Sequence, residues 1–146
     1  MIDNSYPLQI RWADLDPNFH LRHSVYYDWG AYCRILFFSA HNLTPDEMQK
    51  LNIGPIIFRE ECIFKKEIRF GDDVSIDVTL TKARRDFSRW SVSHHIIKNQ
   101  EILSAILTLD LAWLNTNERK LSVPPEKVAA VIEAMPKDKS FEWTDK

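Results

Sequence analysis

The chain has 146 residues, of which 45% are hydrophobic and 27% are charged, typical of one globular domain, which we expect to span residues 1–146. Its formal net charge of −2 predicts neither a nucleic acid partner nor binding to an anionic membrane, and its three glycines are too few for a phosphate-binding loop or a dinucleotide-binding motif. No apolar run is long enough to cross a bilayer and no leader-like segment opens the chain, so we expect a cytoplasmic protein.

A strand, a loop and a long helix are predicted in the first part of the chain. Residues 6–13 alternate in polarity as a strand does, and a loop follows from Asp14 to His23. Ser24 is predicted to be the N-cap of a helix that ends near Ala40. Apolar residues cover almost the whole circumference of this helix, which indicates burial on most sides.

The rest of the chain consists mainly of predicted strands. A Thr-Pro-Asp-Glu cap at residues 44–47 opens a short helix, and a last helix over residues 126–135 precedes a charged tail that we expect to be loose. Apolar patterning predicts strands over 56–70, 74–80, 90–97 and 102–114. Strands that follow one another without helices favour an antiparallel sheet, and one largely apolar helix needs a sheet that curls around it. The predicted fold class is α+β, with an antiparallel sheet wrapped around a long central helix.

The loop before the central helix is the most informative segment. Two carboxylates, Asp14 and Asp16, are followed by Pro17 and by two histidines, His20 and His23, and the helix begins directly afterwards. A carboxylate in this position can activate water or attack a carbonyl carbon directly. The free N–H groups of the first helical turn can hold the oxyanion that develops. The arrangement therefore favours acyl chemistry.

The same segment resembles the opening motif of the hotdog-fold acyl-CoA thioesterases, in the branch that includes 4-hydroxybenzoyl-CoA thioesterase. That motif reads roughly D-x-D-x-x-G-H-V-x-N-x-x-Y, followed by a helix with A-R. This chain matches it at Asp14, Asp16, His20, Leu21, Tyr26 and Arg34. The resemblance implies a hotdog fold, a homodimer or tetramer with the active site between subunits, and an acyl-CoA substrate. It also implies that Asp16 is the catalytic carboxylate and that no further cofactor is needed.

The chain departs from this pattern at several positions. The glycine before the histidine is Phe19, the asparagine positions are Arg22 and His23, and the acid that many members carry on the central helix falls at Ala31. Because Phe19 replaces a residue with more backbone freedom, it predicts a different path for the loop. Arg22 and His23 enlarge and charge the mouth of the acyl pocket.

The two aspartates have different expected roles. Asp16 is predicted to be the base or nucleophile, and its ordinary interpretation is a loop carboxylate that caps a turn before Pro17. We expect Asp14 to tie the loop through backbone N–H groups. The N–H groups near His23 and Ser24 are predicted to hold the thioester oxygen, which depends on their position and not on their side chains.

Other residues of the loop and the helix start are candidates for binding substrate. His20 is predicted to orient the loop, and His23 to take part in the chemistry or to bind substrate, although a structural role is the simpler interpretation of each. Arg22 and Tyr26 are predicted to line the site. His20 and His23 could also hold a metal, but we find no third ligand and predict no metal site.

A local basic cluster, which we call the arginine cluster, falls on a predicted connection between strands. It consists of Lys82, Arg84, Arg85 and Arg89. Arginine and lysine at the mouth of a groove would bind the phosphates of coenzyme A. The ordinary interpretation is a solvated turn in which Asp86 is an ion-pair partner.

The remaining reactive residue types have structural interpretations. His94 and His95 are adjacent in a strand and must face opposite sides, so we expect one to be buried and hydrogen-bonded and the other exposed. Cys33 and Cys62 lie in apolar segments and are predicted to be reduced thiols.

The leading hypothesis is an acyl-CoA thioesterase. A non-catalytic module that binds acyl-CoA or an acyl carrier is the alternative, motivated by Phe19 and Ala31. A hydroxyacyl dehydratase that uses His20 or His23 ranks last, because Asp28 is the only acid on the central helix.

Overall fold

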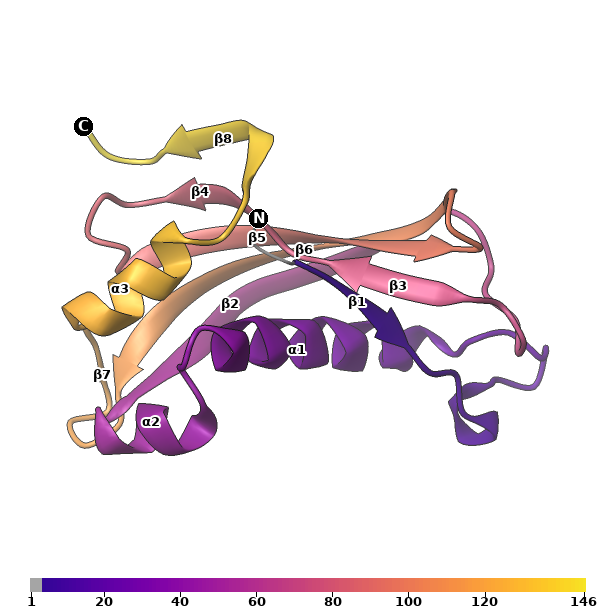
Figure 1. The fold of residues 1–146 in the computed structure, drawn as a ribbon, viewed down its shortest axis with the longest axis horizontal. Coiled ribbons are helices and arrows are strands. Elements are labelled where there is room, and N and C mark those ends of the chain that lie inside the picture. The colour runs from indigo at the N-terminus through magenta and orange to yellow at the C-terminus, as the bar shows by residue number, and fades with distance from the viewer. Residues whose placement is uncertain (1–3) are drawn as a thin grey trace.

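The computed structural model describes residues 4–146, which form one curled sheet with a long helix across its concave face (Figure 1). The first half of the chain contains β1 (Ser5–Leu8), the 3₁₀ helix η1 (Trp12–Asp14), α1 (His23–Ala40), α2 (Pro45–Lys50) and β2 (Ile53–Phe64). The second half contains β3 (Val74–Asp77), β4 (Thr79–Ala83), β5 (Arg89–Lys98), β6 (Ile102–Asn115), β7 (Lys120–Leu121), α3 (Glu126–Glu133) and β8 (Lys137–Trp143).

In the described part of the chain the sheet has eight strands and is almost entirely antiparallel, as predicted. The three longest strands, β2, β6 and β5, lie side by side with β6 in the middle, and β2 is at one edge of the sheet. Both β3 and β4 pair with β5 on its other side, and β1 and β8 extend the sheet beyond them. The parallel pairing of β4 with β8 is the exception. The predicted single strand over 74–80 breaks at Val78, which lies between β3 and β4.

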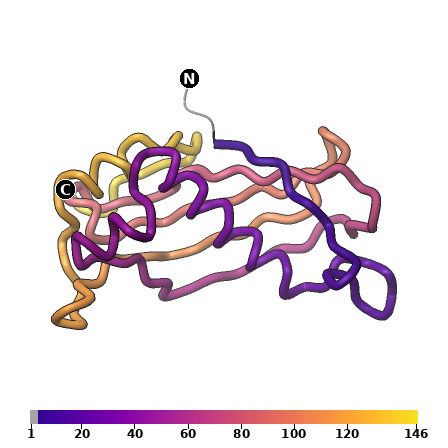
Figure 2. The backbone as a smooth tube through the Cα atoms, turned by 60° about the horizontal axis from the view of Figure 1, so that its bottom comes forward, coloured from indigo at the N-terminus to yellow at the C-terminus, as the bar shows by residue number. Residues whose placement is uncertain are grey.

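Helix α1 supplies much of the core, as expected for a central helix. Its side chains at Val25, Cys33 and Phe37 are buried, and so are residues of β6 such as Leu107 and Leu109. Figure 2 shows α1 crossing the strands on this side of the sheet. The expectation of burial on most sides is wrong, however, because the sheet covers one face of the helix only. Tyr32, on the uncovered face, is 50% exposed.

The tail is the largest correction to the predicted elements. Residues 137–143 form β8, which pairs with β4, where we expected a loose segment. Aromatic packing explains the order of this segment, since the ring of Trp143 lies 5.0 Å from that of Phe141 and 5.7 Å from that of Phe87. A search for local patterns misses this strand because its apolar partners lie far away in the sequence.

The boundaries at the start of the chain also differ from the prediction. The first strand ends at Leu8, and residues 12–14 form η1 instead of continuing it. The N-cap of α1 is Arg22, so the expectation that Ser24 caps this helix is wrong. The short helix α2 begins as predicted, where the Thr44 hydroxyl accepts a hydrogen bond from the N–H of Glu47 (3.2 Å).

Several predictions about single residues and segments can be compared with the structure. His94 is fully buried and hydrogen-bonded, which confirms one half of the prediction for this pair. His95 was expected to be exposed, but its side chain is 30% exposed and its Nδ1 lies 3.1 Å from Asp77 Oδ1. Cys33 is buried, Cys62 is half-buried, and both are free thiols. Within residues 4–146, none of the helices combines the length and the apolar character that passage through a membrane requires.

Candidate active site

Asp16 closes a tight turn in the loop that leads into α1. The Asp16 N–H donates to the carbonyl of His20 (2.8 Å), and the Phe19 N–H donates to the carbonyl of Asp16 (3.0 Å). The carboxylate oxygen Oδ1 of Asp16 accepts hydrogen bonds from the N–H groups of Asn18 (2.8 Å) and His20 (3.1 Å). Asp16 therefore does cap a turn, as its ordinary interpretation predicts, and within residues 4–146 both of these side-chain hydrogen bonds go to Oδ1 and none to Oδ2.

The backbone at Phe19 has φ of 65°, in the left-handed region that glycine adopts most easily. Phe19 stands where the family motif has glycine, and we expected this replacement to divert the loop. Instead, Phe19 takes a glycine-like conformation, which lets the His20 N–H return to Asp16. The replacement therefore does not remove the local geometry that a glycine would allow.

Asp14 anchors the other side of the loop, as predicted. Its side chain is buried and accepts from the Arg11 N–H (2.9 Å) and from the Arg11 guanidinium (2.7 Å). The hydrogen bond from Arg11 holds the pKa of the Asp14 carboxyl below its ordinary value. The carbonyl of Asp14 accepts from the Arg22 N–H (2.8 Å), and the Leu21 N–H donates to Ile68 (2.7 Å). These bonds fix the loop both to itself and to the segment between β2 and β3.

Asp16 lies in the wall of a pocket of about 320 Å³, which we call the Asp16 pocket. It is lined by Asp16, His20, Leu21, His23, Tyr26, Phe64, Lys65, Lys66 and Glu67. Four predicted site residues thus meet here, from the loop and from the first turn of α1. Residues 64–67 were missed from the sequence, because only sheet pairing brings the end of β2 against this loop.

The carboxylate of Glu67 orients His20. His20 Nε2 lies 2.7 Å from Glu67 Oε2, and the other oxygen of Glu67 lies 2.6 Å from the Arg69 guanidinium. A backbone bridge between His20 and Arg69 joins the same two segments. His20 therefore ties the loop to the segment after β2, in line with its predicted orienting role. Among residues 4–146, no group of three or more His, Cys, Asp or Glu side chains is placed to hold a metal ion.

Tyr26 forms the apolar floor of the pocket. Its side chain is buried and meets the ring of Phe64 edge-on, with the ring centres 4.9 Å apart. Burial raises the pKa of Tyr26 to about 12, so the phenol stays neutral at physiological pH.

The first turn of α1 borders the pocket, since His23 and Tyr26 line it, whereas Ser24 is not among the lining residues. The helix begins at His23, and the Val25 N–H already donates to the carbonyl of Arg22 (3.1 Å). The N–H groups of His23 and Ser24 belong to the helix end, where no preceding turn can accept from them. Arg22 is occupied elsewhere, since its guanidinium donates to Ser24 Oγ (3.1 Å) and to the carbonyl of Ala13.

The arginine cluster lies far from Asp16 within one chain. Arg89 pairs with Ala112 of β6, whereas Phe64, beside the Asp16 pocket, pairs with Ala105. Seven residues along a strand correspond to about 23 Å. The structure therefore does not bring the predicted phosphate-binding arginines to the Asp16 pocket of the same chain.

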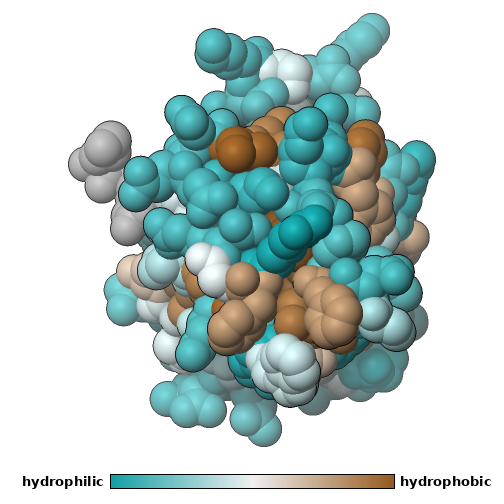
Figure 3. Space-filling model, turned by 90° about the vertical axis from the view of Figure 1, so that its right-hand side faces the viewer, coloured by the Kyte–Doolittle hydropathy of each residue, from teal (hydrophilic) through white to brown (hydrophobic). Residues whose placement is uncertain are grey.

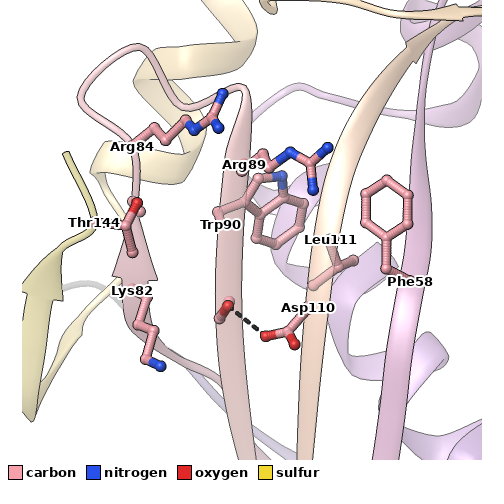
Figure 4. Close-up of a pocket in the computed structure, with 10 residues that line it drawn as sticks. Phe58, Lys82, Arg84, Arg89, Trp90, Asp110, Leu111 and Thr144 are labelled. Atoms are coloured by element: carbon pink, nitrogen blue, oxygen red, sulfur yellow. Dashed lines mark hydrogen bonds between the residues drawn. The ribbon is translucent and has the colours of Figure 1, made fainter.

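The cluster borders a second pocket, of about 360 Å³ (Figure 4). Its lining includes Lys82, Arg84 and Arg89, and the guanidinium of Arg89 lies 4.8 Å from the ring centre of Phe58. Arg85 is not part of this lining, since its guanidinium lies over the ring of Trp143 at 5.0 Å.

Arg34, which matches the family motif, has a structural partner that sequence reasoning missed. It is buried, and its Nη1 lies 3.0 Å from His94 Nε2. His94 Nδ1 lies 2.8 Å from the carbonyl of Asp77, so Nδ1 carries the proton and Nε2 accepts from Arg34. Burial lowers the pKa of His94 to about 3 and keeps the imidazole neutral. The pair links α1 to the sheet and is not among the residues that line the Asp16 pocket.

Solved structures with the same fold are numerous. A hypothetical protein from Staphylococcus aureus in complex with CoA has a TM-score of 0.80 and 16% identity, over 92% of this chain and 87% of its own. A 1,4-dihydroxy-2-naphthoyl-CoA thioesterase from Synechocystis has a TM-score of 0.79 and 16% identity, over 90% of this chain and 96% of its own. A gentisyl-coenzyme A thioesterase has a TM-score of 0.76 and 21% identity, over 88% and 98%. At these identities the similarity shows the fold, which is the hotdog fold predicted from the motif.

Sequence comparison gives the family directly. No curated protein matches the chain at a significant level. The sequence profile of the thioesterase-like superfamily, however, matches residues 10–132, which include the Asp16 loop, the central helix and all the long strands. The chain therefore belongs to the thioesterase-like superfamily.

Proposed function

We propose that this protein hydrolyses an acyl-CoA thioester to a free acid and CoA, with Asp16 as the catalytic carboxylate. The observation that carries this proposal is the position of Asp16. It lies in one pocket with the first turn of a long helix, and hydrogen bonds to its Oδ1 hold the carboxylate in place. Family membership supports the same class of reaction.

The chemistry needs no group beyond these and a water molecule. The thioester oxygen accepts from the N–H groups of His23 and Ser24, which stabilise the oxyanion as the carbonyl carbon becomes tetrahedral. Asp16 Oδ2 takes a proton from water, whose oxygen attacks that carbon. The C–S bond then breaks, and the thiolate takes up a proton to leave as free CoA. In the alternative route, Asp16 attacks the carbonyl carbon itself, and water hydrolyses the resulting anhydride.

The test is CoA release by wild type and Asp16→Asn, followed with a thiol-trapping dye over short, long and aromatic acyl-CoAs. An asparagine oxygen can still accept from the N–H groups of Asn18 and His20, so the turn keeps its shape. We expect turnover to fall at least a hundredfold while the melting temperature changes little. Wild-type turnover in Asp16→Asn would contradict the assignment. Binding of acyl-CoA by wild type without any thiol release would instead favour the non-catalytic binding module.

We further propose that two copies of the chain pair along β2. Among residues 4–146, β2 pairs with one strand, β6, and its side chains include a series of exposed apolar residues: Ile57, Phe58, Ile63 and Phe64. An exposed apolar edge strand of this length favours pairing with another strand. Antiparallel pairing of β2 with its own copy would bring the Phe64 end of one subunit toward the start of β2 in the other. The arginine cluster of one subunit would then approach the Asp16 pocket of the second, where it could hold the phosphates of CoA.

Complementation in trans tests this arrangement. We expect Arg84→Ala/Arg89→Ala to raise KM for acyl-CoA and Asp16→Asn to abolish turnover. If each site takes Asp16 from one subunit and the arginines from the other, a mixed dimer of the two variants has one site with all of these residues intact. That site should have the wild-type KM. A monomer in sedimentation analysis, or a mixture no more active than the arginine variant alone, would reject the shared site.

A further inference from the structure

The turn that closes on Asp16 contains an unusual residue for its backbone conformation. Phe19, with φ of 65°, lies in the left-handed region, which bulky side chains rarely adopt. The turn needs this conformation, because it directs the His20 N–H to Asp16 Oδ1 (3.1 Å). Glycine would serve the turn without strain. Strained residues of this kind are concentrated at functional sites, so the aromatic side chain calls for a reason of its own.

Core packing does not supply that reason, because the Phe19 side chain is 69% exposed. The antiparallel bridge between His20 and Arg69 joins the segments that carry Phe19 and Phe70, and Phe70 is 61% exposed. Figure 3 looks at this end of the molecule and shows apolar side chains gathered among polar ones. We call Phe19 and Phe70 the aromatic rim.

Phe19 of the aromatic rim lies in the same turn as residues that line the Asp16 pocket. Asp16, His20 and Leu21 line the pocket, and Phe19 lies between the first two in the same turn. Phe19 and Phe70 do not line the pocket themselves, so they can contact only a part of the thioester that extends beyond it. Two exposed phenyl rings can cover apolar surface of that part, but they offer no conventional hydrogen-bond partner to a hydroxyl group.

We propose that the aromatic rim is a specificity element that contacts the far end of the acyl group and selects plain hydrocarbon over hydroxylated acyl chains. This inference rests on the proposed function, because it takes the acyl group to lie in the Asp16 pocket. It explains why a strained phenylalanine occupies a position where glycine would be easier to accommodate. Burying one methylene improves affinity about fourfold, and contact with a half-exposed rim is expected to give about twofold.

The test uses thioether analogues of acyl-CoA, which bind but cannot be hydrolysed. We would measure Kd by calorimetry for S-butyl-CoA, for S-octyl-CoA and for an S-octyl-CoA that ends in a hydroxyl group. The proteins are wild type, Phe19→Gly, Phe19→Asn and Phe19→Leu. Both glycine and asparagine tolerate the left-handed conformation, so the turn persists, whereas leucine keeps an apolar surface. Tyr32→Ala, which replaces another exposed aromatic residue that lines neither the Asp16 pocket nor the pocket of the arginine cluster, is the matched control.

In wild type and in Tyr32→Ala we expect Kd to fall about sixteenfold from the butyl to the octyl thioether, because four methylenes are added, and the terminal hydroxyl to cancel most of this gain. Phe19→Gly and Phe19→Asn should lose the dependence on chain length, and Phe19→Leu should retain it. If Kd depends on chain length in Phe19→Gly and Phe19→Asn as it does in wild type, the proposal is overturned. The same holds if these variants change their oligomeric state while the dependence of Kd on chain length stays the same. The two proposals can fail separately, since a rim-dependent Kd without thiol release would refute hydrolysis alone.

Discussion

The buried pair of Arg34 and His94 predicts how the stability of the fold depends on pH. His94 is fully buried, and burial lowers its pKa from 6.5 to about 3. In the unfolded chain the imidazole takes up a proton as pH falls through 6.5, whereas in the folded protein it stays neutral until about pH 3. The unfolded state therefore binds more protons over this interval, and the free energy of unfolding falls as the pH falls.

The magnitude follows from linkage for one group. A difference of one bound proton changes the free energy of unfolding by about 1.4 kcal/mol for each pH unit. Protonation of His94 in the unfolded state should therefore lower the free energy of unfolding by about 2 kcal/mol as the pH falls from 6.5 to 5. His95 acts in the opposite direction, because its hydrogen bond to Asp77 raises its pKa. The contribution of His94 must therefore be isolated by comparison with a variant that keeps His95.

His94→Gln is that variant. A glutamine oxygen can accept from Arg34 but does not titrate, and every other ionisable group remains. Urea denaturation at pH 7.5 and pH 5.0 should show that wild type loses about 2 kcal/mol more than His94→Gln between the two values. An equal loss in both proteins would refute the assignment of a neutral His94 in the folded state.

Three further predictions concern stability and can be measured by urea denaturation. Thr44→Ala should lower the free energy of unfolding by about 1 kcal/mol, because it removes the N-cap of α2; an unchanged value would mean that the cap contributes nothing. Trp143→Ala should cost about 2 kcal/mol through lost contact with Phe87, with the exposed Glu142→Ala as a near-neutral control; equal effects would show that β8 is loosely attached. Phe19→Gly should stabilise the fold by about 0.5–1 kcal/mol, since relief of the left-handed strain exceeds the extra entropy of glycine in the unfolded chain; destabilisation would contradict the strained conformation.

The sequence determined the features that depend on neighbouring residues. The cap at Thr44, the long strands of the sheet and the central helix all follow from local pattern, because caps and amphipathic periodicity act within a few residues. The Asp16 loop could be recognised for the same reason, since the residues of its motif all lie within one short segment.

The tertiary structure decided the features that depend on distant segments. Residues 64–67 join the Asp16 pocket only because β2 pairs with β6 and brings its end against the loop. The tail forms β8 because it pairs with the edge of β4 and because Trp143 packs against Phe87. The strand break at Val78 likewise coincides with contacts to distant residues, since the Asp77 carbonyl lies 2.8 Å from His94 Nδ1 and the Asp77 carboxylate accepts from the His95 N–H (2.7 Å). Hydrogen bonds between strands and burial of side chains join residues that are far apart in the chain, so local sequence patterns do not predict these contacts.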